Sequence, residues 1–366
     1  MTNTFRVFAP GRFVLSGEHQ DYIGLPVLSQ AIPYYQIFEV TPNDNHKIVF
    51  VSEVTNEKIV FSTDDVILSY VSSRDYVRSA WNVVSQYSLS RAKGALIRSL
   101  TEFTLAAGLA SSSAFVTGLV EVFLQLKGIK KIDPLLRAKL AFNAEVTEFN
   151  EPGGMQDHLA ASFGGTNFLL FHPKIQVNPL KFNLNGHLFI INSGVQKKNT
   201  VGDLVLLKEK INQAIYEAKR ADPNFDIQVF PTKKIENLTL NKEYEKVLHG
   251  ILTMRNLTLT LKRELKINDG LISYEKLGEY FNKQQDIIEN NLEVTNPLIQ
   301  KTIKDITNLG ATGAKVNGSG KGGAIIAVFP PFENVNEIKD AIRNLGYSVF
   351  YVGESGRGCF VLRHYK

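Results

Sequence analysis

The chain has 366 residues and a formal net charge of +5, and its composition is 44% hydrophobic, 21% charged and 10% aromatic. This length and composition predict about two globular domains, each with its own core, and exclude a disordered or collagen-like protein. The mild and scattered positive charge favours a small anionic ligand over nucleic acid. The single cysteine, Cys359, excludes an internal disulfide framework.

The apolar segments of the chain are short. None reaches the length of a membrane span, and the first residues, MTNTFRVFAP, lack the basic and apolar segments of a secretory signal. We therefore expect a cytoplasmic protein whose partners include neither a membrane nor nucleic acid.

The first half of the chain is predicted to mix short strands with amphipathic helices. Runs rich in β-branched and aromatic residues predict strands at residues 4–9, 48–51, 59–61 and 95–105. Helical spacing of apolar residues predicts helices at residues 76–88, 113–126 and 133–149. Asp133-Pro134 favours the start of the last helix, because a capping acceptor precedes a first-turn proline.

A polar, proline-bearing stretch at residues 172–179 predicts a domain boundary, which divides the chain into residues 1–178 and 179–366. The second part is predicted to contain helices at residues 202–220, 244–262, 274–289 and 297–309. Strands are predicted at residues 187–192, 324–329 and 359–362. Because no regular βαβ rhythm occurs, both parts favour an α+β fold.

The segment LAAGLASSSA at residues 105–114 has small uncharged side chains between a predicted strand and a predicted helix. Small side chains let the backbone approach a ligand, and the unsatisfied N–H groups of a helix start favour phosphate. The serine hydroxyls could also ligate a magnesium ion that bridges phosphates. The alternative is a tight packing turn with capping serines.

The glycine-rich segment at residues 310–323 contains a formal G-x-G-x-x-G from Gly318 to Gly323. A dinucleotide fingerprint needs a helix after it, whereas a strand is predicted here. A Walker loop is excluded too, because Lys321 is followed by Gly322 and not by Ser or Thr. We interpret the segment as a glycine loop near phosphates, with a plain hairpin turn as the alternative.

Two further segments carry polar groups suited to chemistry. Glu145 and Glu148 lie near the end of a predicted helix, and Asp157 follows a glycine turn. A magnesium-binding carboxylate and a separate base are what phosphoryl transfer to an alcohol uses, although solvated or capping acids have the same pattern. In the segment APGRFVLSGEHQDY at residues 9–22, two glycines interrupt a predicted strand and expose polar side chains that could hold polyol hydroxyls, namely Arg12, Glu18, His19 and Asp21. A solvated turn is the alternative there.

Taken in order, the segments APGR…GEH, GLASSSAF, GGMQD…FGG and GAKVNGSGKGG resemble the motifs of the GHMP kinase superfamily. The resemblance covers nearly the whole chain and is closest to the galactokinase-like sugar kinases. It implies a two-domain α+β GHMP kinase fold, with an N-terminal ribosomal-protein-S5-like domain and a C-terminal ferredoxin-like domain. It also implies that ATP and Mg²⁺ bind at the serine-glycine loop.

The resemblance further implies roles for individual residues. Asp157 corresponds to the catalytic aspartate, and Arg12 to a basic residue that pairs with this aspartate and with the phosphoryl group. Ser112 and Glu145 correspond to the magnesium ligands, with Glu148 as the alternative to Glu145. The residues that would bind ATP are Gly108, Leu109, Ala110, Ser111, Ser112, Ser113, Ala114, Gly318, Ser319 and Gly320.

The same resemblance narrows the range of molecules that could accept the phosphoryl group. Galactokinases bind their sugar through a segment similar to the one that carries Glu18, His19, Asp21 and Tyr22 here. In contrast, Val14 and Ser16 depart from the galactokinase pattern, the chain lacks the Tyr-x-x-Arg-Arg run, and GGMQD is more similar to fucokinases and heptose-phosphate kinases.

We expect an ATP- and Mg²⁺-dependent kinase, monomeric or homodimeric, that forms a galactose-like sugar 1-phosphate. The alternatives are a kinase of mevalonate or of a sugar phosphate of the heptose 7-phosphate type, for which Lys197-Lys198 could bind the phosphate. A non-catalytic sugar sensor on the same fold is a further alternative.

Overall fold

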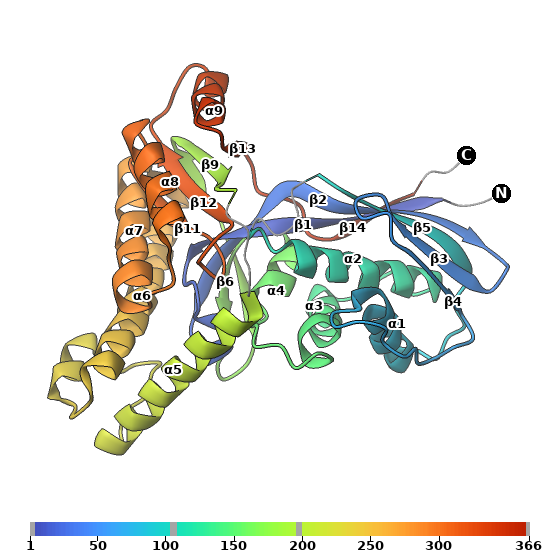
Figure 1. Ribbon diagram of the computed structural model, residues 1–366, viewed down its shortest axis with the longest axis horizontal. Helices are drawn as coiled ribbons and strands as arrows, with labels where there is room; N and C mark the ends of the chain where they lie inside the picture. Colours follow the sequence, from blue (N-terminus) through green and yellow to red (C-terminus); the bar gives the residue numbers. More distant parts are fainter. Residues whose placement is uncertain (1–3, 103–107, 195–199, 364–366) are drawn as a thin grey trace.

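The computed structural model describes residues 4–102, 108–194 and 200–363, which form two sheets with helices packed on them (Figure 1). Within these residues, none of the helices is long and apolar enough to cross a membrane. The larger sheet has the strand order β14-β1-β2-β5-β3-β4, with β6 paired to β2 and β7 paired to β6. Its strands are β1 (Phe5–Ser16), β2 (Val27–Asn43), β3 (Lys47–Ser52), β4 (Lys58–Ser62), β5 (Gly94–Thr101), β6 (Thr166–Leu170), β7 (Gln176–Leu180) and β14 (Phe360–Arg363).

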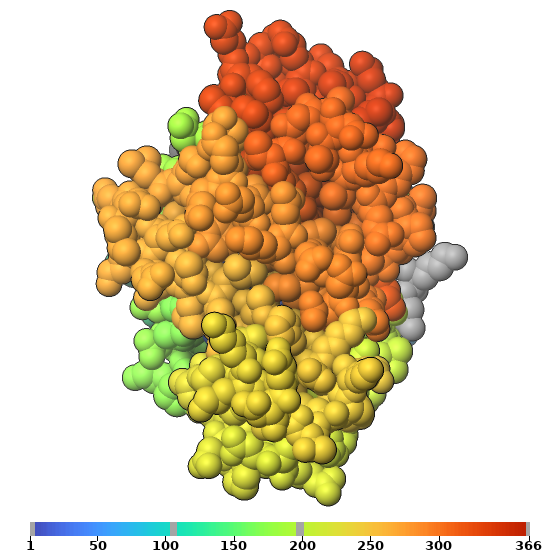
Figure 2. Space-filling view, turned by 90° about the vertical axis from the view of Figure 1, so that its left-hand side faces the viewer, coloured from blue at the N-terminus to red at the C-terminus, as the bar shows by residue number. Residues whose placement is uncertain are grey.

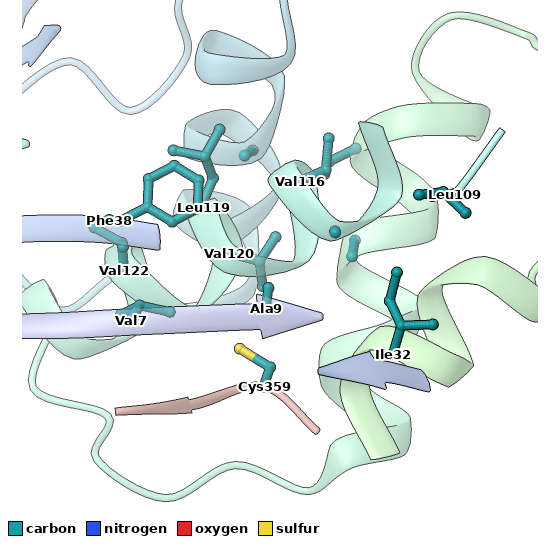
Figure 3. Close-up of a cluster of buried hydrophobic side chains, with 14 of the residues drawn as sticks. Val7, Ala9, Ile32, Phe38, Leu109, Val116, Leu119, Val120, Val122 and Cys359 are labelled. Atoms are coloured by element: carbon teal, nitrogen blue, oxygen red, sulfur yellow. The ribbon is translucent and has the colours of Figure 1, made fainter. Parts of the chain in front are cut away.

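Four helices lie along one face of this sheet (Figure 1). They are α1 (Tyr76–Tyr87), α2 (Ser111–Leu126), α3 (Pro134–Phe142) and α4 (Gln156–Phe163). Apolar side chains of α2 pack on β1 and β2, as Figure 3 shows for Val120, Ala9 and Phe38. The approach is close, because a Cβ atom on Gly118 would lie 2.3 Å from the Phe38 ring. This packing fixes the position of the first turn of α2 relative to β1 and β2.

The smaller sheet is antiparallel and has the order β11-β12-β9-β13. Its strands are β9 (His187–Asn192), β11 (Gly313–Val316), β12 (Ala324–Phe329) and β13 (Ser348–Val352). A βαββαβ chain with this strand order is ferredoxin-like. The helices of this half cover the face in Figure 2 and are α5 (Thr200–Ala221), α6 (Lys242–Ile267), α7 (Tyr274–Asp286), α8 (Pro297–Asn308) and α9 (Val335–Asn344).

Short elements complete the described chain. A parallel pair joins β8 (Asn183–Asn185) to β10 (Leu271–Ser273). The remaining helical turns are η1 (Asp21–Ile23), η2 (Asn143–Thr147), η3 (Thr232–Asn237) and η4 (Ile287–Asn291).

Most predicted elements occur with the predicted type, and the differences have local causes. The predicted helix at residues 133–149 ends its α-helical part at Phe142, because η2 is a π-helical turn. The predicted strand at 4–9 continues to Ser16, since a register shift carries β1 past Gly11. No range was predicted for helix α9 or for strands β2, β6, β7, β8, β10, β11 and β13. Residues 103–107 of the predicted strand at 95–105 lie outside the described chain.

The predicted boundary between residues 178 and 179 falls inside β7. The last strand, β14, returns to the larger sheet and pairs with β1. Cys359, just before β14, is buried there in the core of the first half, and burial raises the pKa of its thiol to about 12. The division at residue 178 therefore stays a prediction, with the chain end contributing to the first sheet.

Candidate active site

A cavity of about 500 Å³ lies where the two halves meet, and all four motif segments contribute to its lining. The sequence-predicted residues that line it are Arg12, Glu18, His19, Asp21, Tyr22, Gly108, Ala110, Ser111, Ser112, Ser113, Glu145, Asp157, Gly318 and Ser319. Segments more than 300 residues apart thus share one site, which supplies both acidic and cationic groups.

In the lining of this cavity, Arg12 and Asp157 form an ion pair with 2.6 Å between Nε and Oδ1. The second half of the guanidinium is also held, because Nη1 donates to the Gly108 carbonyl at 3.0 Å. The arginine side chain is only 5% exposed, whereas the Asp157 side chain is 25% exposed. The pair therefore presents a fixed and partly accessible carboxylate to the cavity, at the first turn of α4.

The N-terminus of α2 forms the neighbouring wall. Ala110, the residue before this helix, has a left-handed conformation with φ of 59°, and among the described residues its side chain caps no helix amide. The three serines that follow line the cavity. Amide groups at a helix start carry a partial positive charge and bind anions, so this wall is suited to phosphate.

Glu145 approaches the same wall from η2. Its side chain is buried, its Oε2 lies 2.7 Å from Nε2 of His158, and it accepts hydrogen bonds from Ser112 and Ser113. Burial alone would raise the pKa of Glu145, but the charge and hydrogen bond of His158 and the serine hydrogen bonds outweigh it and lower that pKa. Glu145 is therefore held as a carboxylate.

The alternative carboxylate, Glu148, has a different environment. It is exposed and accepts a hydrogen bond from the Tyr70 hydroxyl on the outside of the helix. Of the two candidate metal ligands, Glu145 is the one whose carboxylate lines the cavity beside the serines.

The serine and glutamate oxygens suit magnesium. Mg²⁺ prefers hard oxygen donors and usually takes one or two carboxylates together with substrate phosphates and water. In the described part of the chain, no cluster of three or more His, Cys, Asp or Glu could hold a metal by itself. Ser112 and Glu145 therefore fit a magnesium ion that arrives with a bound phosphate.

The other end of the cavity is lined by the segment after β1. His19 Nδ1 and the Tyr22 hydroxyl lie 3.1 Å apart. Asp21 accepts a hydrogen bond from the backbone amide of Gln156 at 3.2 Å. Burial and the charge of Asp157 raise the pKa of Asp21 to about 6.

Gly154 is required for this arrangement, because a Cβ atom there would lie 2.0 Å from an Asp21 carboxylate oxygen. The contact joins the GGMQD segment to the segment after β1. The two sequence motifs are therefore packed against each other on the acidic side of the cavity.

Comparison with known proteins agrees with this geometry. Residues 75–165 match the GHMP kinases N terminal domain and residues 267–348 match the GHMP kinases C terminal domain. Residues 2–42 match the galactokinase galactose-binding signature. The chain belongs to the GHMP kinase superfamily.

Relatives of this GHMP kinase include several galactokinases. It is 28% identical to the galactokinase of Pyrococcus furiosus over 343 residues, which covers 92% of each chain. It is 26% identical to the galactokinase of Mannheimia succiniciproducens over 353 residues, covering 93% of this chain and 89% of that one. The fold matches Lactococcus lactis galactokinase complexed with galactose with a TM-score of 0.82 at 21% identity, over 98% and 95% of the two chains. The predicted GHMP kinase fold and galactokinase-like kinase class are confirmed.

Three residues expected at the ATP site of this GHMP kinase are not among those that line the cavity. Leu109 and Ala114 are packed in the hydrophobic core, and Gly320 lies against the backbone of Val294, where a Cβ atom would come within 2.4 Å of the carbonyl oxygen. Lys197-Lys198, considered for a phosphate acceptor, lie outside the described residues.

Other lining residues were missed from the sequence. Phe50, Val54 and Thr55 of the β3–β4 hairpin line the cavity together with Phe115 of α2. Phe50 and Phe115 follow ordinary strand and helix patterns, and Val54 and Thr55 lie in an ordinary turn, so no local signal marks them as cavity residues. Their role at the cavity is visible only in the folded chain.

Proposed function

We propose that this kinase transfers the γ-phosphoryl group of ATP to the anomeric hydroxyl of a galactose-like sugar, forming the sugar 1-phosphate and ADP. The observation that carries the proposal is the position of Arg12. Its guanidinium contacts Asp157 on one side and the Gly108 carbonyl, at the start of the serine segment, on the other. An acid and the segment that leads into α2, whose helix start is suited to phosphate, are thereby held on either side of one cation.

Asp157 is proposed to receive or orient the hydroxyl proton as the sugar oxygen attacks the γ-phosphorus and the bond to the ADP oxygen breaks. Arg12 would hold the Asp157 carboxylate in place and face the negative charge of the transferring group. Most of the acceleration would come from positioning and charge stabilisation, because phosphoryl transfer asks for little covalent chemistry from the protein.

Ser112 and Glu145 are the residues that would hold Mg²⁺. When bound, the ion would neutralise charge on the phosphates. Residues at the start of α2 line the cavity, as do Gly318 and Ser319, and their backbone amides would bind the phosphate chain.

The sugar is proposed to lie against Glu18, His19, Asp21 and Tyr22, which all line the cavity. These side chains combine hydrogen-bond donors and acceptors, which is what a ring with several hydroxyl groups requires. Gly154 keeps Asp21 in this wall, and Gln156 fixes one of its oxygens.

An acceptor panel tests the proposal. The purified protein with ATP and MgCl₂ is offered galactose, fucose, mevalonate and heptose 7-phosphate, and ADP release is measured for each. We expect ADP release with a galactose-like sugar, and phosphorus NMR of the product should show a phosphate on the anomeric carbon. Turnover of mevalonate or heptose 7-phosphate alone would contradict the proposal, as would binding of sugar and ATP without ADP formation.

A further inference from the structure

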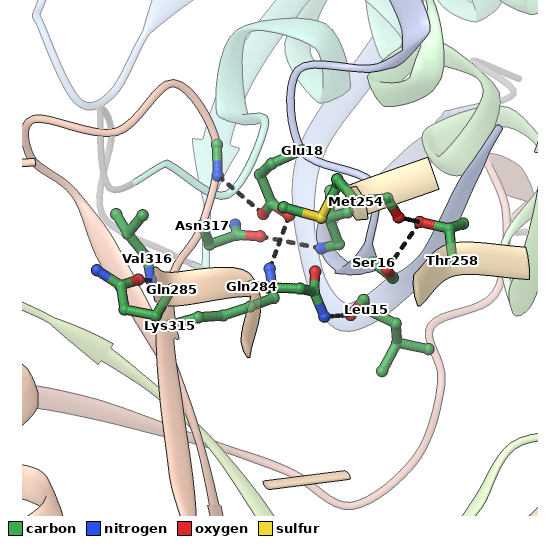
Figure 4. Close-up of polar contacts among 12 residues, drawn as sticks. Leu15, Ser16, Glu18, Met254, Thr258, Gln284, Gln285, Lys315, Val316 and Asn317 are labelled. Carbon is green, nitrogen blue, oxygen red and sulfur yellow. Dashed lines mark hydrogen bonds and ion pairs between the residues drawn. The ribbon is translucent and has the colours of Figure 1, made fainter. Parts of the chain in front are cut away.

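Strand β11 and the residue after it present a fully buried polar face to the first half of the molecule. Successive side chains of a strand point to opposite sides. Ala314 and Val316 belong to the hydrophobic core of the second half. Lys315 and Asn317 alternate with them, and both are 0% exposed. A buried lysine and a buried asparagine need polar partners, and they find them across the joint between the two halves (Figure 4).

Lys315 serves the acceptor end of the cavity. Its Nζ donates to Glu18 Oε2 at 2.7 Å, and both side chains are at most 1% exposed. The other carboxylate oxygen of Glu18 lies 3.4 Å from the Gly318 amide. One carboxylate thus joins the segment that lines the acceptor end to the glycine loop, and Lys315 supplies the counter-charge that lets it stay buried.

Asn317 serves the phosphate end. Its Oδ1 accepts from the backbone amide of Val14 at 2.9 Å, and its Nδ2 donates to the Gly108 carbonyl at 2.6 Å. That carbonyl is also the acceptor for Nη1 of Arg12. The Gly108 carbonyl thus accepts from both the Asn317 amide and the Arg12 guanidinium. By holding this carbonyl in place, Asn317 also restricts the orientation of Arg12.

We propose that Lys315 and Asn317 are positioning residues with separate tasks in phosphoryl transfer. Lys315 holds the Glu18 carboxylate for acceptor binding, and Asn317 holds Gly108 and, through it, Arg12 for the transfer step. This inference rests on the proposed function, since it concerns the same cavity.

The two tasks predict different kinetic signatures. Lys315→Met should raise the acceptor KM about tenfold or more, because hydrogen bonds to charged groups contribute at that level, while the nucleotide KM stays within about threefold of wild type. Asn317→Leu, which keeps the side-chain size and removes both hydrogen bonds, should lower kcat about tenfold or more with the acceptor KM nearly unchanged.

Loss of folding is separated from loss of positioning by a second variant. Lys315→Met leaves Glu18 as an unpaired buried carboxylate and should lower the melting temperature, whereas the double variant Glu18→Gln/Lys315→Met removes both charges and should recover it. The acceptor KM of the double variant should remain high, because the carboxylate is gone. Lys304→Met and Asn308→Leu, exposed positions on α8, are the matched controls and should behave as wild type.

The outcomes distinguish this inference from the function on which it rests. A wild-type protein that phosphorylates none of the sugars contradicts both. An active wild type whose Lys315 and Asn317 variants change KM and kcat in the same way contradicts the positioning roles alone, as does a double variant whose acceptor KM returns to the wild-type value.

Discussion

Helices α6 and α2 begin in opposite ways. The first turn of α6 is capped by its own sequence, because the Asn241 side chain accepts from the Tyr244 amide and Glu243 and Glu245 follow in the same turn. By contrast, α2 starts after Ala110 in a left-handed conformation, with no side-chain cap and no acid in its first turn among the described residues. The amides in the first turn of α6 therefore have a partner from the helix's own sequence, whereas the first turn of α2 faces the cavity without such a cap.

The same contrast holds more widely in the two halves. Helices α7 and α8 are capped by Ser273 and Asn296, and neither helix start lines the cavity. Helix α4, which does line it, follows Met155 without a side-chain cap from its own N-cap residue, and the Gln156 amide is satisfied by the distant Asp21. Local caps stabilise the scaffold, and α1 has one as well, because Asp75 accepts from the Arg78 amide although Tyr76 lines the cavity. At α4, by contrast, the partner of a first-turn amide comes from another segment.

The largest expected effect comes from the acid at the start of α4. Asp157→Asn should lower kcat by about 10³-fold, since a positioned proton acceptor contributes on that order. The dissociation constant for the ATP–magnesium complex should change by no more than a few fold, because Asn can still accept from Arg12. ADP release and calorimetric titration measure the two quantities, and equal losses in both would contradict the role of Asp157.

A smaller effect is expected from the acid that caps α4 from a distance. With the pKa of Asp21 at about 6 in the folded protein, its carboxyl is protonated below its unfolded pKa of about 4 in both states. Between pH 4 and 6 the unfolded chain loses this proton while the folded protein keeps it, so the free energy of unfolding falls by up to about 3 kcal/mol, and the loss is complete above pH 6.

Asp21→Asn should remove this loss, so its stabilising effect should be full at pH 8 and absent at pH 4. Denaturant unfolding at both pH values measures it. A benefit that is equal at the two pH values would show that Asp21 is not the titrating group.

The variant Ser112→Ala tests the proposed role of the first turn of α2 in holding magnesium. The magnesium concentration for half-maximal rate should rise about tenfold, the size of effect seen when groups at a metal site are removed, and the melting temperature should stay close to wild type. Kinetics over a range of MgCl₂ concentrations measure the shift. An unchanged magnesium requirement would remove Ser112 from the proposed metal site.

The matched change at the capped helix is the smallest. Asn241→Ala should lower the free energy of unfolding by about 1 kcal/mol, without altering kcat or either KM, because α6 starts outside the cavity lining. Denaturant unfolding and steady-state kinetics check the two halves of this prediction. A change in kcat or in either KM would contradict the view that the start of α6 affects stability alone.

Sequence reasoning found the cavity segments that have a local pattern, but it could not predict the contacts between residues far apart in the chain. The small residues before α2 and the glycine loop could be interpreted from spacing and side-chain size, and both flank the cavity. The link between Glu18 and Lys315 could not, because 297 positions separate them and a lysine in a short apolar strand has no distinctive pattern. The family resemblance, not periodicity, assigned Asp157 and Arg12 their roles.

Elements were missed for similar reasons. Strand β2 is buried along much of its length, so it lacks the alternation of a half-exposed strand, and prolines at 33 and 42 break its pattern. The π-helical turn at η2 has no recognised sequence signal, yet it places Glu145 in the cavity while Glu148 stays exposed. Such features depend on tertiary packing, which a single sequence does not display.

A structure with galactose, magnesium and a non-hydrolysable ATP analogue bound tests the central claim most directly. We predict that the anomeric hydroxyl oxygen lies within hydrogen-bond reach of the Asp157 carboxylate, about 3 Å, with the γ-phosphate between Arg12 and the start of α2. A sugar bound away from Asp157, or a phosphate chain bound away from the α2 serines, would contradict the assignment of this cavity as the site of phosphoryl transfer.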